Sequence, residues 1–90
     1  MDSTAEKKLV GLLKKGDVSA FDELFARYSK RIYCFALSYL KNREDSEGIV
    51  QEVFFRIWKS RQKVNEHYSF KSFLFTISYN LIMDRFREKM

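Results

Sequence analysis

The sequence contains no proline, one cysteine, one histidine and three glycines. Without proline and with few glycines, the backbone has few enforced breaks, which favours long helices. The single cysteine, Cys34, excludes a disulfide within the chain, and we expect it to be a small residue packed between helices. Since neither cysteine nor histidine forms a cluster and no glycine-rich phosphate loop is present, no metal or other cofactor is expected.

Long apolar segments are also missing. No run is long enough to span a bilayer, and no secretory hydrophobic segment opens the chain, so we expect a cytoplasmic protein without membrane insertion. Hydrophobic residues nevertheless make up 46% of the chain and aromatic residues 17%, which is too apolar for a disordered segment. The length of 90 residues predicts one domain with a single core.

The net charge of +5 is unevenly distributed. Basic and acidic residues cancel from residue 1 to residue 55, so the whole excess lies between residues 56 and 90. Such a segment is either a solvated basic face or a surface for a polyanionic partner.

Apolar spacing of three and four residues predicts an all-α fold, a compact bundle of three long helices plus a short N-terminal helix. The short helix covers residues 1–15 and stops near Gly16, and residues 16–90 form the core bundle. A capping box of Ser19 and Asp22 is expected to begin the second helix. The buried stripe of this helix is predicted to contain Phe21, Leu24, Phe25, Tyr28, Ile32, Phe35, Ala36, Tyr39 and Leu40.

The third helix, which follows Asn42 and reaches about Ser60, has two contrasting faces. Val50, Val53, Phe54 and Ile57 point to the core, with Ile49 and Trp58 beside them. Gly48, Gln51, Glu52, Phe55 and Lys59 lie opposite. This outer face is either solvated, with one aromatic exposed by chance, or a docking face for a protein in which Phe55 is the anchor.

The fourth helix begins near Ser69 and is apolar on most of its surface. Its core stripe is predicted as Phe70, Phe73, Leu74, Ile77 and Leu81. The other side carries Phe75, Tyr79, Ile82 and Phe86 among Lys71, Thr76, Asn80, Arg85 and Arg87. We expect Ile82 and Phe86 to pack beneath the short first helix, whereas Phe75 and Tyr79 either pack or stack on unpaired bases, with the cations on phosphates.

Two ordered motifs, "REDSEGIVQEVFFRIWKS" and "SFKSFLFTISYNLIMDRFREK", resemble region 2 of the bacterial sigma factors, most closely the extracytoplasmic-function (ECF) group. The resemblance covers roughly residues 16–89. Its signals are Asp45, Glu47, Val50, Gln51, Glu52, Phe54 and Trp58 in the first motif, and Phe73, Leu74, Phe75, Thr76, Ile77, Asn80, Leu81, Asp84 and Arg87 in the second.

The resemblance implies a transcription initiation factor domain that docks on the RNA polymerase core and melts the promoter element just upstream of the start site. The start of the third helix is similar to the surface that contacts the coiled coil of the largest polymerase subunit. On this basis the polymerase contacts are Asp45, Glu47, Gln51, Glu52 and Phe55.

The loop from Lys63 to Ser69 and the start of the fourth helix resemble the element that flips a base of the non-template strand into a pocket. The implied DNA contacts are Asn65, His67, Tyr68, Lys71, Phe75, Thr76, Tyr79 and Asn80, with Lys63, Arg85 and Arg87 on phosphates. Asp84 is expected on the inner side of its helix, where it ties an arginine or a backbone amide.

Two departures from the family pattern stand out. Gly48 replaces a residue that is usually acidic, which removes charge from the docking face and lowers helix propensity by about 1 kcal/mol relative to alanine. The chain also ends at Met90, and the linker and region 4 domain of the family are absent, so we expect a fragment covering one domain. The family further implies an anti-sigma factor as partner.

Two other classes of function compete with this interpretation. One is a helical protein–protein interaction module without a nucleic-acid role, whose binding would depend weakly on salt. The other is an enzyme, which the residues disfavour because His67 is a lone histidine in a polar loop.

Overall fold

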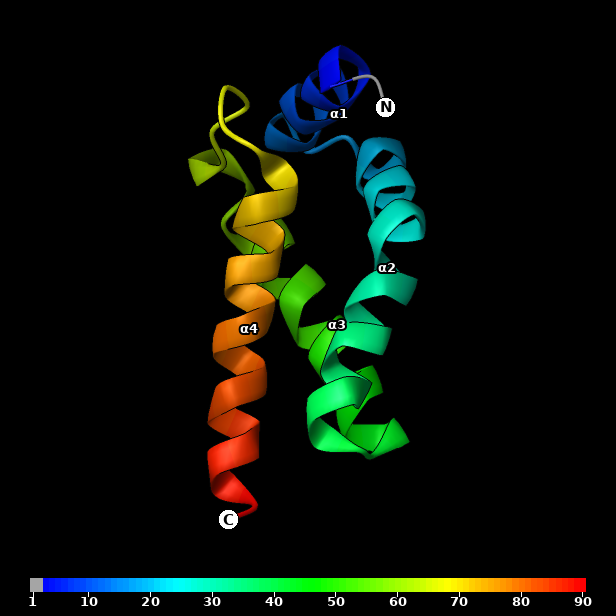
Figure 1. The fold of residues 1–90 in the computed structure, drawn as a ribbon. Coiled ribbons are helices and arrows are strands. Elements are labelled where there is room, and N and C mark those ends of the chain that lie inside the picture. Colours follow the sequence, from blue (N-terminus) through cyan, green and yellow to red (C-terminus); the bar gives the residue numbers. More distant parts are fainter. Residues whose placement is uncertain (1–2) are drawn as a thin grey trace.

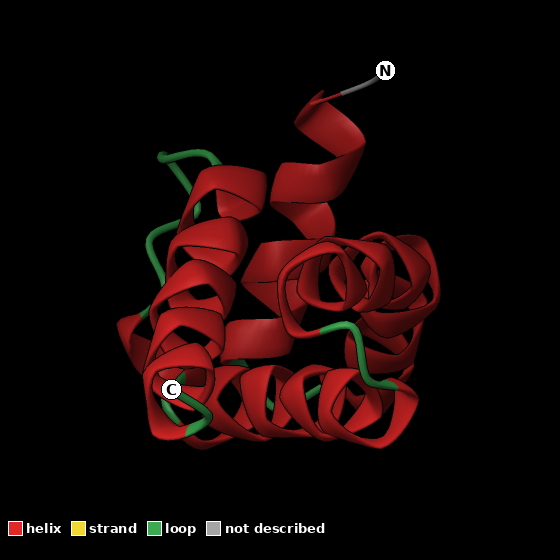
Figure 2. Ribbon diagram, turned by 60° about the horizontal axis from the view of Figure 1, so that its bottom comes forward, coloured by secondary structure: helices red, strands yellow, loops and turns green. Residues whose placement is uncertain are grey.

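The computed structural model describes residues 3–90, which form four α-helices and no strand (Figures 1 and 2). The helices are α1 (Ser3–Lys14), α2 (Val18–Leu40), α3 (Arg43–Lys59) and α4 (Phe70–Glu88), and a short 3₁₀ helix, η1 (Arg61–Lys63), follows α3. The predicted all-α class is therefore confirmed. Within this range no helix is long and apolar enough to cross a membrane.

Short polar side chains start three of the helices. Asp17 accepts a hydrogen bond from the Ala20 N–H at 3.0 Å at the start of α2. Asn42 accepts one from the Asp45 N–H in α3, and Ser69 accepts one from the Ser72 N–H in α4. These bonds satisfy backbone donors that the first helical turn leaves unpaired.

The predicted capping box of Ser19 and Asp22 is wrong, because α2 begins one residue before Ser19 and Asp17 is its cap. Gly16 explains the earlier start. It has a positive φ of 87°, a conformation that glycine adopts without strain, and it turns the chain directly from α1 into Asp17. The predicted stop of the first helix near Gly16 agrees with this turn.

The helix α2 is central, because it packs against α1, α3 and α4. In Figure 1, α1 lies across one end of the bundle, and the C-terminal end of α4 lies at the opposite end. The core contains residues of all four helices and of the loop before α4, which makes the fold one hydrophobic unit. Its members include Val10, Leu13, Leu24, Tyr28, Ile32, Ala36, Ile49, Val53, Phe54, Ile57, Val64, Phe70, Leu74 and Ile82.

The apolar stripe of α2 is wider than the area that its neighbours cover. Phe25 and Tyr39 are each 39% exposed, and Phe21 and Phe35 are half-buried at the edges of the stripe. Cys34 is also exposed, so its predicted place between helices is wrong. Periodicity places these residues near the contact face, but the number and position of neighbouring helices decide which of them are buried.

The faces of α4 also differ in part from the prediction. Phe73, placed in the core stripe, is 38% exposed, and Ile77 and Leu81 are half-buried. Ile82 is fully buried, whereas Phe86 is 40% exposed. Phe86 belongs to the last turn of α4, and the C-terminal end of this helix lies opposite to α1 (Figure 1), so packing beneath α1 is wrong for Phe86. The reason is the direction of α4, which packs on α2 and α3 and runs away from α1.

Asp84 is exposed rather than on the inner side of α4, although it forms the expected ion pair with an arginine, Arg87. The buried position on the last turns of α4 belongs to Ile82 instead, which sits two residues earlier and faces the core.

Candidate functional site

The outer face of α3 carries four of the predicted site residues on one side of the helix. We call Glu47, Gln51, Glu52 and Phe55 the α3 face. Phe55 is 59% exposed, and the Lys59 ammonium lies 5.8 Å from the centre of its ring. Glu52 forms an ion pair of 3.0 Å with Arg56 one turn later. Aromatic residues are enriched at protein interfaces and polar groups form the interface rim, so the α3 face is a candidate docking surface.

Two grooves flank the α3 face, and α2 supplies part of each. One groove of about 510 Å³ separates α2 from the first half of α3, and the other, of about 340 Å³, lies beside Phe55. The apolar spacing of α2 predicts burial for Phe21 and Phe25, and the other α2 residues of these grooves carry no sequence signal of a site. The first groove is lined by Phe25, Ser29, Lys30, Tyr33, Arg43, Glu47, Val50 and Gln51, and the second by Val18, Phe21, Asp22, Phe54, Phe55 and Trp58.

Gly48 borders this face without a steric requirement for glycine. A Cβ atom added there would meet nothing within 4 Å. The structure therefore offers no packing reason for a glycine in the middle of α3.

Asp45, the fifth residue predicted to contact polymerase, lies apart from the α3 face and is directed toward α4. Its carboxylate forms ion pairs with Arg85 (Oδ1–Nη1, 3.2 Å) and Lys89 (Oδ2–Nζ, 2.5 Å). The Lys89 ammonium, assisted by the Arg85 guanidinium, holds the pKa of Asp45 below its ordinary value. These two cations give the carboxylate intramolecular partners.

The loop between η1 and α4 presents several predicted nucleic-acid contacts to solvent. Tyr68 is 76% exposed, and Asn65 and His67 are also exposed. The Asn65 side chain accepts a hydrogen bond of 2.8 Å from the His67 N–H, which shapes the loop locally. Val64 is buried and anchors the start of the loop in the core.

The helix α1 holds this loop from one side. Lys14 Nζ lies 2.7 Å from Glu66 Oε1, and this pairing lowers the pKa of Glu66. Arg61 stacks over the Trp58 ring at 4.2 Å and donates to the Trp58 carbonyl. The Lys14–Glu66 contact was not predictable from the sequence, because it joins residues 52 positions apart that only the fold brings together.

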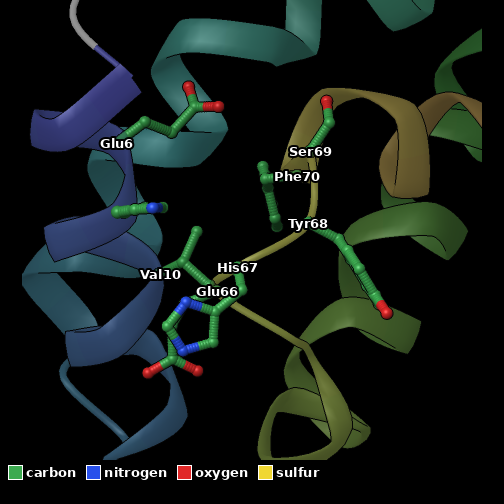
Figure 3. Close-up of a pocket in the computed structure, with 8 residues that line it drawn as sticks. Glu6, Val10, Glu66, His67, Tyr68, Ser69 and Phe70 are labelled. Atoms are coloured by element: carbon green, nitrogen blue, oxygen red, sulfur yellow. The ribbon is translucent and has the colours of Figure 1, made fainter.

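A groove of about 280 Å³ separates α1 from the loop (Figure 3). Glu66 and His67 lie on the side of α1, whereas Tyr68 points to the opposite side, away from α1. The loop therefore divides its side chains between a groove and an open surface. The groove is lined by Glu6, Lys7, Val10, Glu66, His67, Tyr68, Ser69 and Phe70.

Glu6, at the edge of this groove, also fixes α1 on α2. Its Oε1 accepts hydrogen bonds from the Tyr28 hydroxyl (2.7 Å) and from Arg27 (3.1 Å). Burial, with the hydrogen bond to Glu6, raises the pKa of Tyr28 to about 12. The phenol therefore stays protonated over the whole physiological range and acts as a donor to Glu6.

Along α4, Lys71, Phe75 and Tyr79 follow each other at four-residue spacing, with Thr76 and Asn80 beside them. Phe75 is half-buried against Phe35 (5.5 Å between ring centres), and the other four are exposed. Tyr79 makes an edge contact of 6.3 Å with Tyr39 of α2. We call the exposed residues Lys63, Asn65, His67, Tyr68, Lys71, Thr76, Tyr79 and Asn80 the loop–α4 face.

The two arginines predicted on phosphates have acidic partners inside the molecule. Arg85 pairs with Asp45 and more distantly with Glu88, at 3.8 Å, and Arg87 pairs with Asp84. These ion pairs distinguish the two arginines from Lys63 and Lys71 of the loop–α4 face, which have no ion pair among residues 3–90.

Comparison with known proteins matches residues 24–90 to the family described as Sigma-70 region 2. Among curated proteins, the ECF RNA polymerase sigma factor SigW of Bacillus subtilis is 34% identical over 83 residues, which are 92% of this chain and 44% of the relative. The ECF sigma factor SigE of Mycolicibacterium smegmatis is 32% identical over 82% of this chain and 30% of its own length. The chain thus spans less than half of these relatives.

Among solved structures, the chain is similar to an engineered region 2 of sigmaE, determined by NMR in complex with GTAAAA. The TM-score is 0.84 at 24% identity, over 93% of this chain and 87% of that one. At this identity, the likeness establishes a shared fold.

Proposed function

Since the chain belongs to the Sigma-70 region 2 family, we propose that it is the promoter-melting domain of an ECF sigma factor, which docks on the RNA polymerase core and binds the non-template strand. The family consists of transcription initiation factors rather than enzymes, and we assign no catalytic residue. In this proposal residues 1–90 form one domain, a bundle of three long helices with the short α1 at one end.

The observation that carries the nucleic-acid part is the loop–α4 face. It combines exposed aromatic rings, Tyr68 and Tyr79, with two lysines that have no acidic partner in the described part of the chain. Rings stack on unpaired bases, and cations neutralise phosphates. A region 2 of similar fold was solved in complex with GTAAAA, which supports a nucleic-acid role for this chain.

The α3 face suits the protein part of the function. Phe55 offers an apolar anchor, while Glu47 and Gln51 border the groove between α2 and α3. We propose that the coiled coil of the largest polymerase subunit docks here, with Glu47, Gln51, Glu52 and Phe55 as contacts. The same face is the natural target of an anti-sigma factor, because a protein bound there would block docking.

A binding experiment tests the nucleic-acid surface. We expect the triple variant Tyr68→Ala, Lys71→Gln, Asn80→Ala to bind a single-stranded oligonucleotide with the non-template promoter sequence at least tenfold more weakly, because base stacking alone is worth about 1–3 kcal/mol. Fluorescence anisotropy against a labelled oligonucleotide measures this. Lys30→Gln, which removes one exposed lysine of α2 outside this face, is the control and should bind normally. Unchanged binding by the triple variant would contradict the assignment of the loop–α4 face as the nucleic-acid surface.

Retention of core polymerase separates this proposal from a helical interaction module with no role in transcription. The domain, immobilised through a terminal tag, should retain purified core polymerase, and the retention should fall when Glu47 and Gln51 are both replaced by alanine. A domain that binds other proteins but neither core polymerase nor single-stranded DNA would favour the interaction module.

A further inference from the structure

The carboxylate of Asp45 is held between two cations, Arg85 in the last turns of α4 and Lys89, the residue directly after this helix. Its two oxygens are divided between them: Oδ1 lies 3.2 Å from Arg85 Nη1, and Oδ2 lies 2.5 Å from Lys89 Nζ. The Asp45 side chain is 21% exposed, whereas those of Arg85 and Lys89 are 39% and 43% exposed. The acid is therefore largely enclosed, while both cations remain reachable from solvent.

This arrangement has the form of an occupied anion site. Guanidinium and ammonium groups bind carboxylate and phosphate oxygens by the same charge-assisted hydrogen bonds. Arg85 has one other acidic neighbour in the described chain, the exposed Glu88 at 3.8 Å, which is a weak partner at this distance and exposure. If the Asp45 carboxylate were removed, two cations would be left side by side with little compensation.

We propose that Arg85 and Lys89 form a phosphate site for the nucleic-acid backbone, and that Asp45 fills this site in the free domain. The proposal rests on the nucleic-acid role given above and adds a competitor to it. A phosphate that binds Arg85 and Lys89 must displace the Asp45 carboxylate. The affinity for nucleic acid at this end of α4 is therefore set by how much more strongly the two cations bind the phosphate than the carboxylate.

The position of Asp45 gives the competition a physical link to α3. Asp45 belongs to the first turn of α3, two residues before Glu47 of the α3 face. A protein that seats on this turn and engages Asp45 would release Arg85 and Lys89. By linkage, bound nucleic acid would free Asp45 for that protein to the same extent.

The test compares the parent and Asp45→Asn in the salt dependence of their binding to an oligothymidylate of twenty nucleotides. Each phosphate neutralised on a single strand contributes a slope of about 0.7 to log K against log salt. Release of both cations should steepen the slope by about 1.4 relative to the parent and raise the affinity at low salt. Glu44→Gln is the matched control, because Glu44 is an exposed acid of the same first turn of α3 and has no ion pair among residues 3–90. An equal effect of the two variants would overturn the proposal.

Arg85→Gln completes a double-mutant cycle. In the parent, the charge of Arg85 is already engaged by Asp45, so Arg85→Gln should change the slope of log K against log salt little. In the Asp45→Asn background, the same substitution should lower the slope by about 0.7. Equal falls in both backgrounds would show no competition. If circular dichroism shows that Asp45→Asn lowers the helicity, the Arg85→Gln variant of the parent still tests the proposal. A fall of about 0.7 in its salt slope would overturn the proposal.

Failure of the masked phosphate site can be distinguished from failure of the proposed function. Failure of the triple variant at Tyr68, Lys71 and Asn80 to change promoter-strand binding speaks against the proposed base-reading surface. An additive cycle between Asp45 and Arg85, with promoter-strand binding intact, speaks against the masked phosphate site alone. Absence of salt-dependent oligothymidylate binding in the Asp45→Asn variant also overturns it.

Discussion

Phe54 and Phe55 are adjacent in the chain but differ in surroundings. Phe54 is 2% exposed and makes edge contacts with Phe21 and Phe25, whereas Phe55 is 59% exposed. Successive residues of a helix point about 100° apart, so a single step moves a side chain from the core to the surface. The pair offers two substitutions of the same chemistry with opposite expected effects.

We expect Phe55→Ala to change the free energy of unfolding by no more than about 0.5 kcal/mol, because the ring is exposed. Phe54→Ala should cost about 3–5 kcal/mol through lost burial and a cavity. Urea unfolding followed by circular dichroism measures both. In addition, Phe55→Ala should weaken retention of core polymerase. A large loss of stability from Phe55→Ala would place its ring in the core and remove it from the docking face.

At this scale the sequence was most informative where a helix has one covered face. The inner residues of α3 and the exposure of Phe55 were predicted correctly from periodicity. Phe73, Cys34 and Tyr39 were misplaced because they lie at the edges of wide apolar stripes. Whether an edge residue is buried depends on which helix passes over it, and a single-helix pattern contains no such information.

The helix α1 supports the loop before α4, although the family match begins only at residue 24. Lys14 holds Glu66 across 52 residues of sequence, and Glu6 fixes α1 to Tyr28 of α2. An element outside the matched region thus restrains a segment that the proposed function uses to contact DNA. This role was not visible in the sequence, because charge pairing between distant segments has no periodic signature.

We expect Lys14→Gln to increase hydrogen exchange of the backbone amides of residues 65–68 while leaving the global stability within about 0.5 kcal/mol, since partly exposed ion pairs are worth little. Mass spectrometry of peptides covering the loop measures the exchange. Lys15→Gln removes the neighbouring charge, which has no ion pair among residues 3–90, and should leave the loop unchanged. Identical exchange in all three proteins would mean that α1 does not restrain the loop through Lys14.

For the molecule as a whole, two carboxylates make the free energy of unfolding depend on pH in the acidic range. The pKa values of Asp45 and Glu66 are lowered by Lys89 and by Lys14, respectively, relative to the ordinary values that they regain on unfolding. A carboxyl group with a lowered folded-state pKa contributes stability above its unfolded pKa, and this contribution is lost as the pH falls through the folded value. The loss therefore lies below about pH 4.

We expect the midpoint of urea unfolding to fall between about pH 6 and about pH 3, and to fall less in the double variant Asp45→Asn, Glu66→Gln. The variant removes the two carboxyl groups whose pKa values are lowered in the folded state. Denaturation curves at several pH values, with Glu47→Gln as the control, measure the difference. Parallel curves for parent and double variant would contradict the assignment of the acid sensitivity to these two pairs.

The arrangement of the candidate site was only partly predictable at this scale. Motif resemblance placed its residues on a loop and two helices, and the structure exposes most of them. The motif resemblance implies that Asp45 contacts polymerase and Arg85 a DNA phosphate, and it gives no indication that these two residues form an ion pair with each other. Such pairing depends on where the end of α4 meets the start of α3, which is a property of the assembled bundle.

The exposed Cys34 on α2 has a practical consequence for all these measurements. It is the sole thiol of the sequence, and it is accessible to reagents. A maleimide fluorophore can therefore be attached at one defined point without adding or removing a cysteine, which gives a spectroscopic reporter on an otherwise unaltered chain.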